Sequence, residues 1–96
     1  MDNDEDARCF RLISGVFHPE EANQLLMTLI EDKIRFHQRN DWSRRERLGE
    51  TDTAGVKRVS ELRQTKAELV GMIEEAAAAG MKLTIRGNIE ITLTPE

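Results

Sequence analysis

Apolar and polar side chains alternate along residues 83–93, close to the end of the chain. The odd positions carry Leu83, Ile85, Ile89, Ile91 and Leu93, and the even positions carry Thr84, Arg86, Asn88, Glu90 and Thr92. A period of two places each set on one face of a strand. A two-residue turn at 87–88 would instead set Ile85 opposite Glu90 and mix the two faces. The pattern therefore predicts one long strand, bent at most at Gly87 and stopped by Pro95.

Apolar residues spaced by three and four predict two helices before this strand. The first begins at "HPEEA", where Pro19 suits the first helical position and Glu20 and Glu21 complement the helix dipole. We expect it to end near residue 38. The second helix spans about 53–79 and ends at Gly80. Its seam is Val59, Leu62, Lys66, Leu69, Ile73 and Ala76.

The connection between the helices carries its own signals. "SRRE" is a capping-box pattern at Ser43, and Gly49 is typical of a helix C-cap. The two together predict a separate short helical turn over 43–48. Thr51 or Asp52 would then cap the second helix.

The segment "CFRLISGVF", residues 9–17, predicts a first strand, with Gly15 marking a bulge or a close approach. The element order is then β-α-α-β, an α+β fold in which an antiparallel helical hairpin packs on a two-stranded antiparallel ribbon. Two strands are marginal alone and leave both edges open. We therefore expect oligomerisation to complete the fold, for example as a four-stranded sheet across a two-fold axis. The expected self-association surface is the first strand with Leu83, Ile85, Ile89, Ile91 and Leu93.

The amino-acid composition indicates the type of hydrophobic core and the cellular compartment. The chain has 96 residues, a net charge of −4, one cysteine and only four aromatic side chains (Phe10, Phe17, Phe36 and Trp42), so an aliphatic core is expected. Cys9, beside Phe10, is expected to be a small core residue, and the single cysteine is typical of a reduced, cytoplasmic protein. The acidic start lacks the basic region of a signal peptide, and no apolar run is long enough to span a membrane.

Charge is distributed unevenly along the chain. Asp2, Asp4, Glu5 and Asp6 account for the whole net charge, which predicts a disordered acidic tail over 1–8 and a single domain over 9–96. Residues 33–66 hold ten basic and five acidic side chains. Residues 18–32 and 67–80 hold seven acidic side chains and no lysine or arginine. The helical hairpin is therefore expected to have a basic tip and an acidic base.

Trp42, Arg44, Arg45 and Arg47 are the candidate partner-contact residues at this tip. Three interpretations stay open. In the first, the charged side chains are solvated and Trp42 packs over the end of the hairpin. In the second, basic tips pair with acidic bases of other subunits. In the third, the tip binds phosphates and stacks a base on Trp42. The third lacks any known nucleic-acid motif, and a pI near 5.2 is far from the usual basic footprint.

Candidate catalytic chemistry is sparse. His18 and His37 are expected at opposite ends of the first helix, roughly 28 Å apart at 1.5 Å per residue, so they cannot share a metal ion within one chain. No zinc-ligand spacing or glycine-rich phosphate loop occurs. We therefore predict no catalytic residue, cofactor or metal site.

The segments "FHPEEANQLLMTLIEDKIRFHQ", "RERLGETD", "KRVSEL" and "LTIRGNIEITL" together resemble a group of short, uncharacterised bacterial proteins. The resemblance covers residues 9–94 and implies a free-standing bacterial protein, but it carries over no functional residue. We expect a cytoplasmic interaction module that forms a homodimer or a larger homo-oligomer, without catalytic activity or membrane association. The alternative is a nucleic-acid or phosphate-binding protein that uses the basic tip, and an enzyme of unknown type ranks third.

Overall fold

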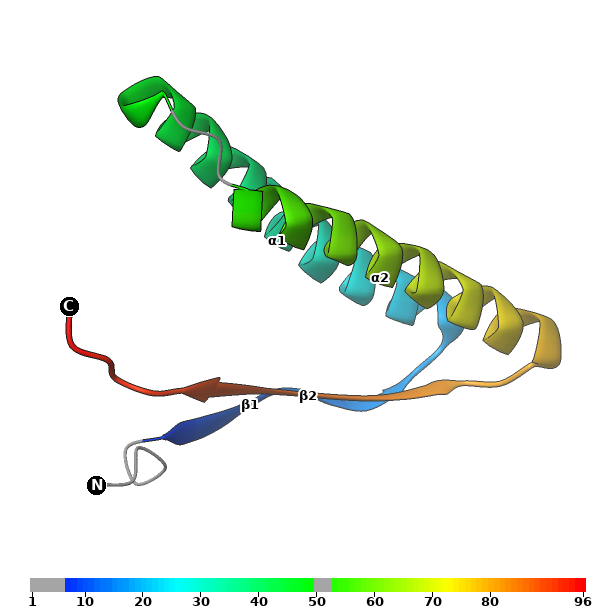
Figure 1. Ribbon diagram of the computed structural model, residues 1–96. Helices are drawn as coiled ribbons and strands as arrows, with labels where there is room; N and C mark the ends of the chain where they lie inside the picture. The colour runs from blue at the N-terminus through cyan, green and yellow to red at the C-terminus, as the bar shows by residue number, and fades with distance from the viewer. Residues whose placement is uncertain (1–6, 50–52) are drawn as a thin grey trace.

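The computed structural model describes residues 7–49 and 53–96. Four elements follow one another along the chain: β1 (Arg8–Phe17), α1 (Pro19–Leu48), α2 (Thr53–Ala79) and β2 (Leu83–Ile91). The strands form an antiparallel pair, and the helices form a hairpin beside it (Figure 1). The predicted α+β order is therefore confirmed. The predicted acidic side chains at positions 2–6 and the predicted cap at Thr51 or Asp52 lie outside the described residues.

The ribbon pairs Phe17 with Leu83 at one end and Arg8 with Ile91 at the other. The single C-terminal strand is confirmed, but it ends at Ile91, before the predicted stop at Pro95. Strand β1 begins one residue before its predicted start. The bulge lies at Leu12, where the register shifts, and not at Gly15. Gly15 is instead a close approach, because an added Cβ would lie 3.3 Å from the ring of Phe17.

The bulge decides which residues of β1 share a face. Without it, Phe10 and Ile13 would point to opposite sides, since their sequence separation is odd. The extra residue places Phe10 opposite Ile89 and Ile13 opposite Gly87. Phe10 therefore joins Ile13 and Phe17 on the face that points towards the helices.

Helix α1 begins as predicted, but it is ten residues longer than expected. The backbone N–H of His18 donates to Glu21 Oε1 at 3.1 Å, which closes the first turn. The helix then continues to Leu48 and ends at Gly49, whose φ is +66°. The predicted end near residue 38 and the separate turn over 43–48 are wrong. No glycine or proline interrupts residues 20–48, so the loss of apolar periodicity did not end the helix. Ser43 and His37 consequently lie inside α1.

Helix α2 has the predicted bounds and a well-defined end. The N–H of Met81 donates to the carbonyl of Ala76 at 2.9 Å, and that of Gly80 to Ala77 at 3.3 Å. Gly80 has a φ of +67°. This is the Schellman arrangement, in which a glycine in the left-handed region turns the chain out of the helix. It directs the chain into β2.

Two small groups of buried side chains hold the fold together. At the junction of the helices and the ribbon, Ala22 is fully buried and packs with Ile73 and Leu83. Further along the hairpin, Leu62 of α2 packs between Ile30 and Ile34 of α1. Within the described residues no large side chain is completely buried. The core is therefore thin for a chain of this length.

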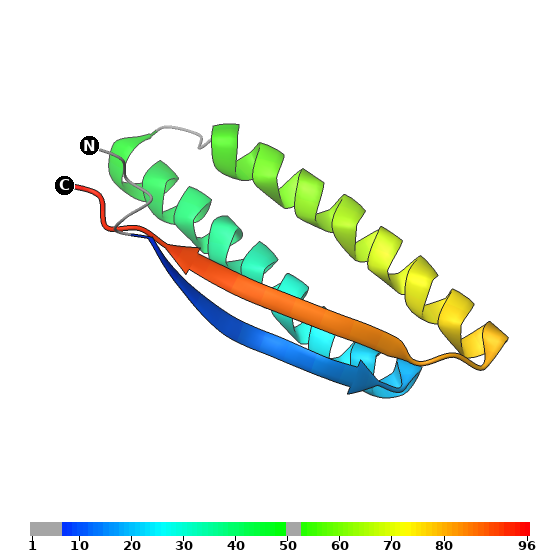
Figure 2. The same cartoon turned by 90° about the horizontal axis from the view of Figure 1, so that it is seen from below.

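The helices cover only one end of the ribbon. The hairpin and the ribbon meet where Phe17 pairs with Leu83 and then diverge, so the molecule is an open wedge (Figure 1). Its radius of gyration is 17.1 Å, whereas a compact domain of this length has about 12.5 Å. Seen from below, α1 passes behind β2, whereas α2 lies to the side of β2 that faces away from β1 (Figure 2). The underside of α2 thus has no strand of its own chain beneath it.

Candidate interaction surfaces

The end of α1 extends past the start of α2 and forms the tip of the hairpin (Figure 1). Trp42 lies there with 65% of its surface exposed, and Arg47 is exposed as well. The side chains of Arg44 and Arg45 lie outside the described part of the structure. The expectation that Trp42 packs as a plug is wrong, because the extra turns of α1 carry it past the region that α2 covers.

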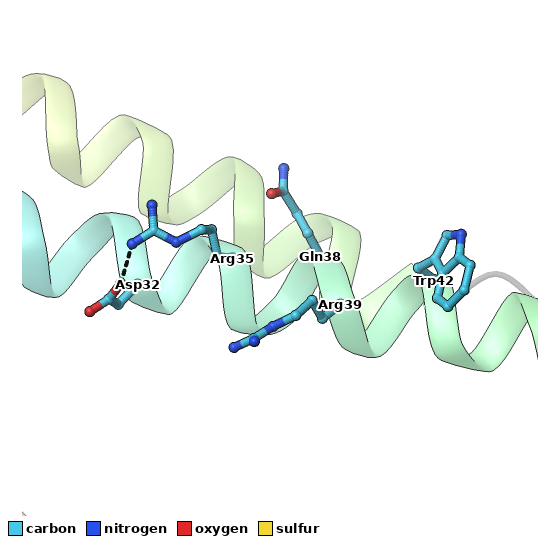
Figure 3. A pocket seen from close by; sticks show the side chains of 5 residues that line it. All are labelled: Asp32, Arg35, Gln38, Arg39 and Trp42. Atoms are coloured by element: carbon cyan, nitrogen blue, oxygen red, sulfur yellow. Dashed lines mark hydrogen bonds and ion pairs between the residues drawn. The ribbon is translucent and has the colours of Figure 1, made fainter.

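A shallow hollow of about 410 Å³ lies along α1 below this tip, lined by Asp32, Arg35, Gln38, Arg39 and Trp42. Arg35 is engaged by Asp32, one turn earlier. Gln38 and Arg39 project to different sides of the helix, and Trp42 stands apart from both (Figure 3). Arginines hold phosphate best when their donors converge on it. The side chains around this hollow do not converge.

Charge at the tip is partly neutralised inside the chain. Arg58 pairs with Glu61 at 3.1 Å within α2. Lys66 of α2 pairs with Glu31 of α1 at 3.0 Å, which links the two helices. Counting Arg35, at least three of the ten basic residues in the 33–66 segment therefore already have a carboxylate partner.

The predicted self-association residues of the segment 83–93 separate into two groups. Leu83 is buried at the junction, and Ile85 packs beside it. Ile89, Ile91 and Leu93 are exposed by 42%, 49% and 74%. One end of the apolar face is therefore core, and the other is uncovered because the helices diverge from it.

An apolar groove of about 500 Å³ lies between α2 and the first residues of β2. Its walls include Leu69 and Met72 of α2, Met81 of the connection, and Leu83 and Ile85 of β2. Met72 and Met81 are each 62% exposed. Our sequence interpretation missed both methionines, because Met72 lies one position off the α2 seam and Met81 follows the helix-ending glycine. The sequence did carry a signal for this surface, because a large apolar side chain lies next to the seam residue Ile73 and another lies next to Gly80.

The two outer edges of the ribbon differ. A bulge interrupts β1 at Leu12, and bulges are one way in which proteins block an edge from pairing with another strand. The nine residues of β2 contain no proline and no register shift of their own. The edge of β2 is therefore the more open template.

The residues considered for catalysis are dispersed. Cys9 is free and exposed, because it pairs with Glu90 on the polar outer face of the ribbon, so its expected core position is wrong. The ring of His37 packs edge-on against Phe36, with centroids 5.5 Å apart. No group of three or more histidine, cysteine, aspartate or glutamate side chains in residues 7–49 and 53–96 is placed to hold a metal ion. Over the same residues, neither helix is apolar enough along its length to cross a bilayer.

Comparison with protein-family models, with curated proteins and with solved structures finds no match for this chain. The resemblance to short bacterial proteins stays a prediction. Any functional conclusion rests on the geometry of these surfaces.

Proposed function

We propose that this protein is a self-associating interaction module of the cytoplasm that acts as a homodimer or larger homo-oligomer and without catalysis. The observation that carries the proposal is the uncovered part of the ribbon's inner face. Phe10, Ile89 and Ile91 lie on the same face as the buried Leu83, yet about half of each side chain is exposed. Contiguous apolar surface of this kind is typical of protein–protein interfaces.

The total surface supports the same proposal. The chain exposes 7910 Å², whereas a compact monomer of 11.0 kDa exposes about 5600 Å². A stable interface of standard size buries about 800 Å² on each partner. The wedge has enough surplus surface to supply such an interface.

The free thiol of Cys9 supports the cytoplasmic setting. It lies on the exposed outer face of the ribbon, and exposed thiols persist more readily in reducing compartments.

Phosphate or nucleic-acid binding by the tip is the weaker candidate. The exposed ring of Trp42 favours it, because bases stack on accessible aromatic side chains. The non-converging side chains of the hollow and the internal pairing of Arg35, Arg58 and Lys66 weigh against it.

Molar mass by light scattering, measured in low and in high salt, tests the proposal. A dimer or larger assembly that persists in high salt is expected, because apolar burial is not screened by ions. Assembly that dissociates in high salt would support pairing of basic tips with acidic bases instead. A strict monomer in both conditions would contradict the proposal.

A second experiment separates the tip from the ribbon. The triple variant Arg44→Glu/Arg45→Glu/Arg47→Glu reverses the charge of the tip and leaves the ribbon unchanged. The molar mass is expected to stay that of the wild type. Salt-sensitive binding of a fluorescent oligonucleotide by the wild type, lost in this variant, would establish the weaker candidate instead.

A further inference from the structure

The sequence of β2 and the two residues after it is nearly symmetric about its centre. The segment "LTIRGNIEITL", residues 83–93, has the same residue at equal distances from Asn88 in three of five cases: Leu83 and Leu93, Thr84 and Thr92, Ile85 and Ile91. A fourth case sets Arg86 against Glu90, which are opposite in charge. In the fifth, Gly87 corresponds to Ile89, a small residue to a large one.

From this symmetry we infer that two copies join through antiparallel pairing of their β2 edges, with the two-fold axis at Asn88. The inference rests on the proposed self-association and specifies its surface and register. In this arrangement Arg86 of each copy lies directly opposite Glu90 of the other. Ile85 lies opposite Ile91, and Leu83 opposite Leu93. Directly opposed apolar and oppositely charged pairs are the unit of sheet stabilisation.

Other registers are less favourable. An axis between two residues would pair odd with even positions and set apolar side chains opposite polar ones. An axis at Arg86 or at Glu90 would bring two like charges together. An axis at Gly87 or at Ile89 separates Arg86 from Glu90. Only an axis at Asn88 sets the two charged residues of β2, Arg86 and Glu90, opposite each other.

The shape of the protomer fits this pairing. The β2 edge is unbroken, and α2 lies beyond it without a strand beneath (Figure 2). A two-fold axis between neighbouring antiparallel strands is perpendicular to the sheet, so both helical hairpins lie on one side of a four-stranded sheet. The second copy's β2 then runs below α2.

The same pairing fills the apolar groove. Ile91 and Leu93 of the second copy would lie beside Ile85 and Leu83 on the inner face, where Met72 and Met81 form the other walls. Leu93 is the most exposed large apolar side chain among the described residues, at 74%. By symmetry, the groove of the second copy receives Leu93 of the first.

A charge exchange tests the register. Arg86→Glu alone sets two acidic residues opposite each other twice in the dimer, and Glu90→Arg alone sets two basic residues opposite each other twice. Each single variant is expected to raise the dimer Kd by about tenfold or more. The double variant Arg86→Glu/Glu90→Arg restores opposite charges and is expected to return the Kd to near the wild-type value. Failure of the double variant to recover affinity would overturn the register.

Cysteine crosslinking tests the axis directly. Directly opposed residues in an antiparallel pair have Cα atoms about 4.5–5.5 Å apart, which is within disulfide range. In a Cys9→Ser background, Asn88→Cys is therefore expected to form a disulfide-linked dimer on mild oxidation. Thr84→Cys is the matched control on the same face. Its two copies would lie about 27 Å apart, eight residues along the strand at 3.4 Å each, and are expected to stay reduced.

The results separate this inference from the proposed function. A wild-type dimer by light scattering, without the charge rescue and without the Asn88→Cys crosslink, would overturn the β2 register but leave self-association standing. A wild-type monomer would overturn both. Efficient crosslinking through Thr84→Cys would show that the strands pair in another register.

Discussion

Two glycines, one inside α2 and one directly after it, provide a matched test of the backbone conformation at the end of that helix. Gly71 lies in the interior of α2, is exposed, and has no positive φ. A Cβ built there meets nothing within 4 Å. Gly71→Ala should therefore stabilise the fold by about 0.8–1.0 kcal/mol, which is the helix propensity of alanine over glycine.

Gly80 also has open space around an added Cβ, but its φ is +67°. An L-residue in this region costs about 1–2 kcal/mol because its Cβ crowds the following carbonyl. The same substitution, Gly80→Ala, is therefore expected to destabilise the fold by that amount. Gly80→Asn should cost less, since asparagine tolerates the left-handed region.

Thermal unfolding followed by far-UV circular dichroism measures both effects at one fixed protein concentration, which matters because the Tm of an oligomer depends on concentration. For a domain of this size, 1 kcal/mol shifts the Tm by about 4–8 °C. The two variants should therefore move the Tm in opposite directions, and the double variant should lie near their sum. Equal signs for the two substitutions would refute the assignment of Gly80 as the left-handed end of α2.

Two further experiments test the helical hairpin. Leu62→Ala should cost about 3 kcal/mol in the free energy of unfolding by denaturant, because Leu62 is 95% buried between Ile30 and Ile34. Leu12→Ala, the same change at a 57% exposed bulge residue, should cost less than about 1 kcal/mol; equal losses would contradict the buried cluster. A double-mutant cycle on the half-exposed Glu31–Lys66 pair should give a coupling of about 0.2–1 kcal/mol that falls with salt. Coupling that is unchanged in high salt would show that the pair is not solvent-screened.

Sequence periodicity predicted most of the fold because the apolar patterns of β2 and α2 each include residues of the buried clusters. The odd positions of β2 contact the helices at Leu83, and the α2 seam buries Leu62 and Ile73. The end of α1 could not be predicted in this way. Beyond residue 38 most of the described side chains of α1 are exposed and no apolar pattern marks them, so only Gly49 indicates where the helix stops.

The sequence indicated where the interaction surfaces lie, but not how much of each surface is exposed. The alternation of β2 indicated an apolar face, but which half is covered depends on the angle between the hairpin and the ribbon. That angle follows from packing around Ala22, a tertiary contact that no local pattern encodes. The shape of the groove beside Met72 and Met81 depends on the same angle.

The wedge also has a mechanical consequence. Its two arms are joined at the buried cluster of Ala22, Ile73 and Leu83, close to one end of each arm. The 30 residues of α1 form an arm about 45 Å long, so a rotation of about 10° at that joint would move the far end of the helix by about 8 Å. Such a rotation would change the packing of this cluster and of the partly buried side chains that contact it. The position of Trp42 and the basic tip relative to the ribbon therefore depends on how this one small cluster is packed.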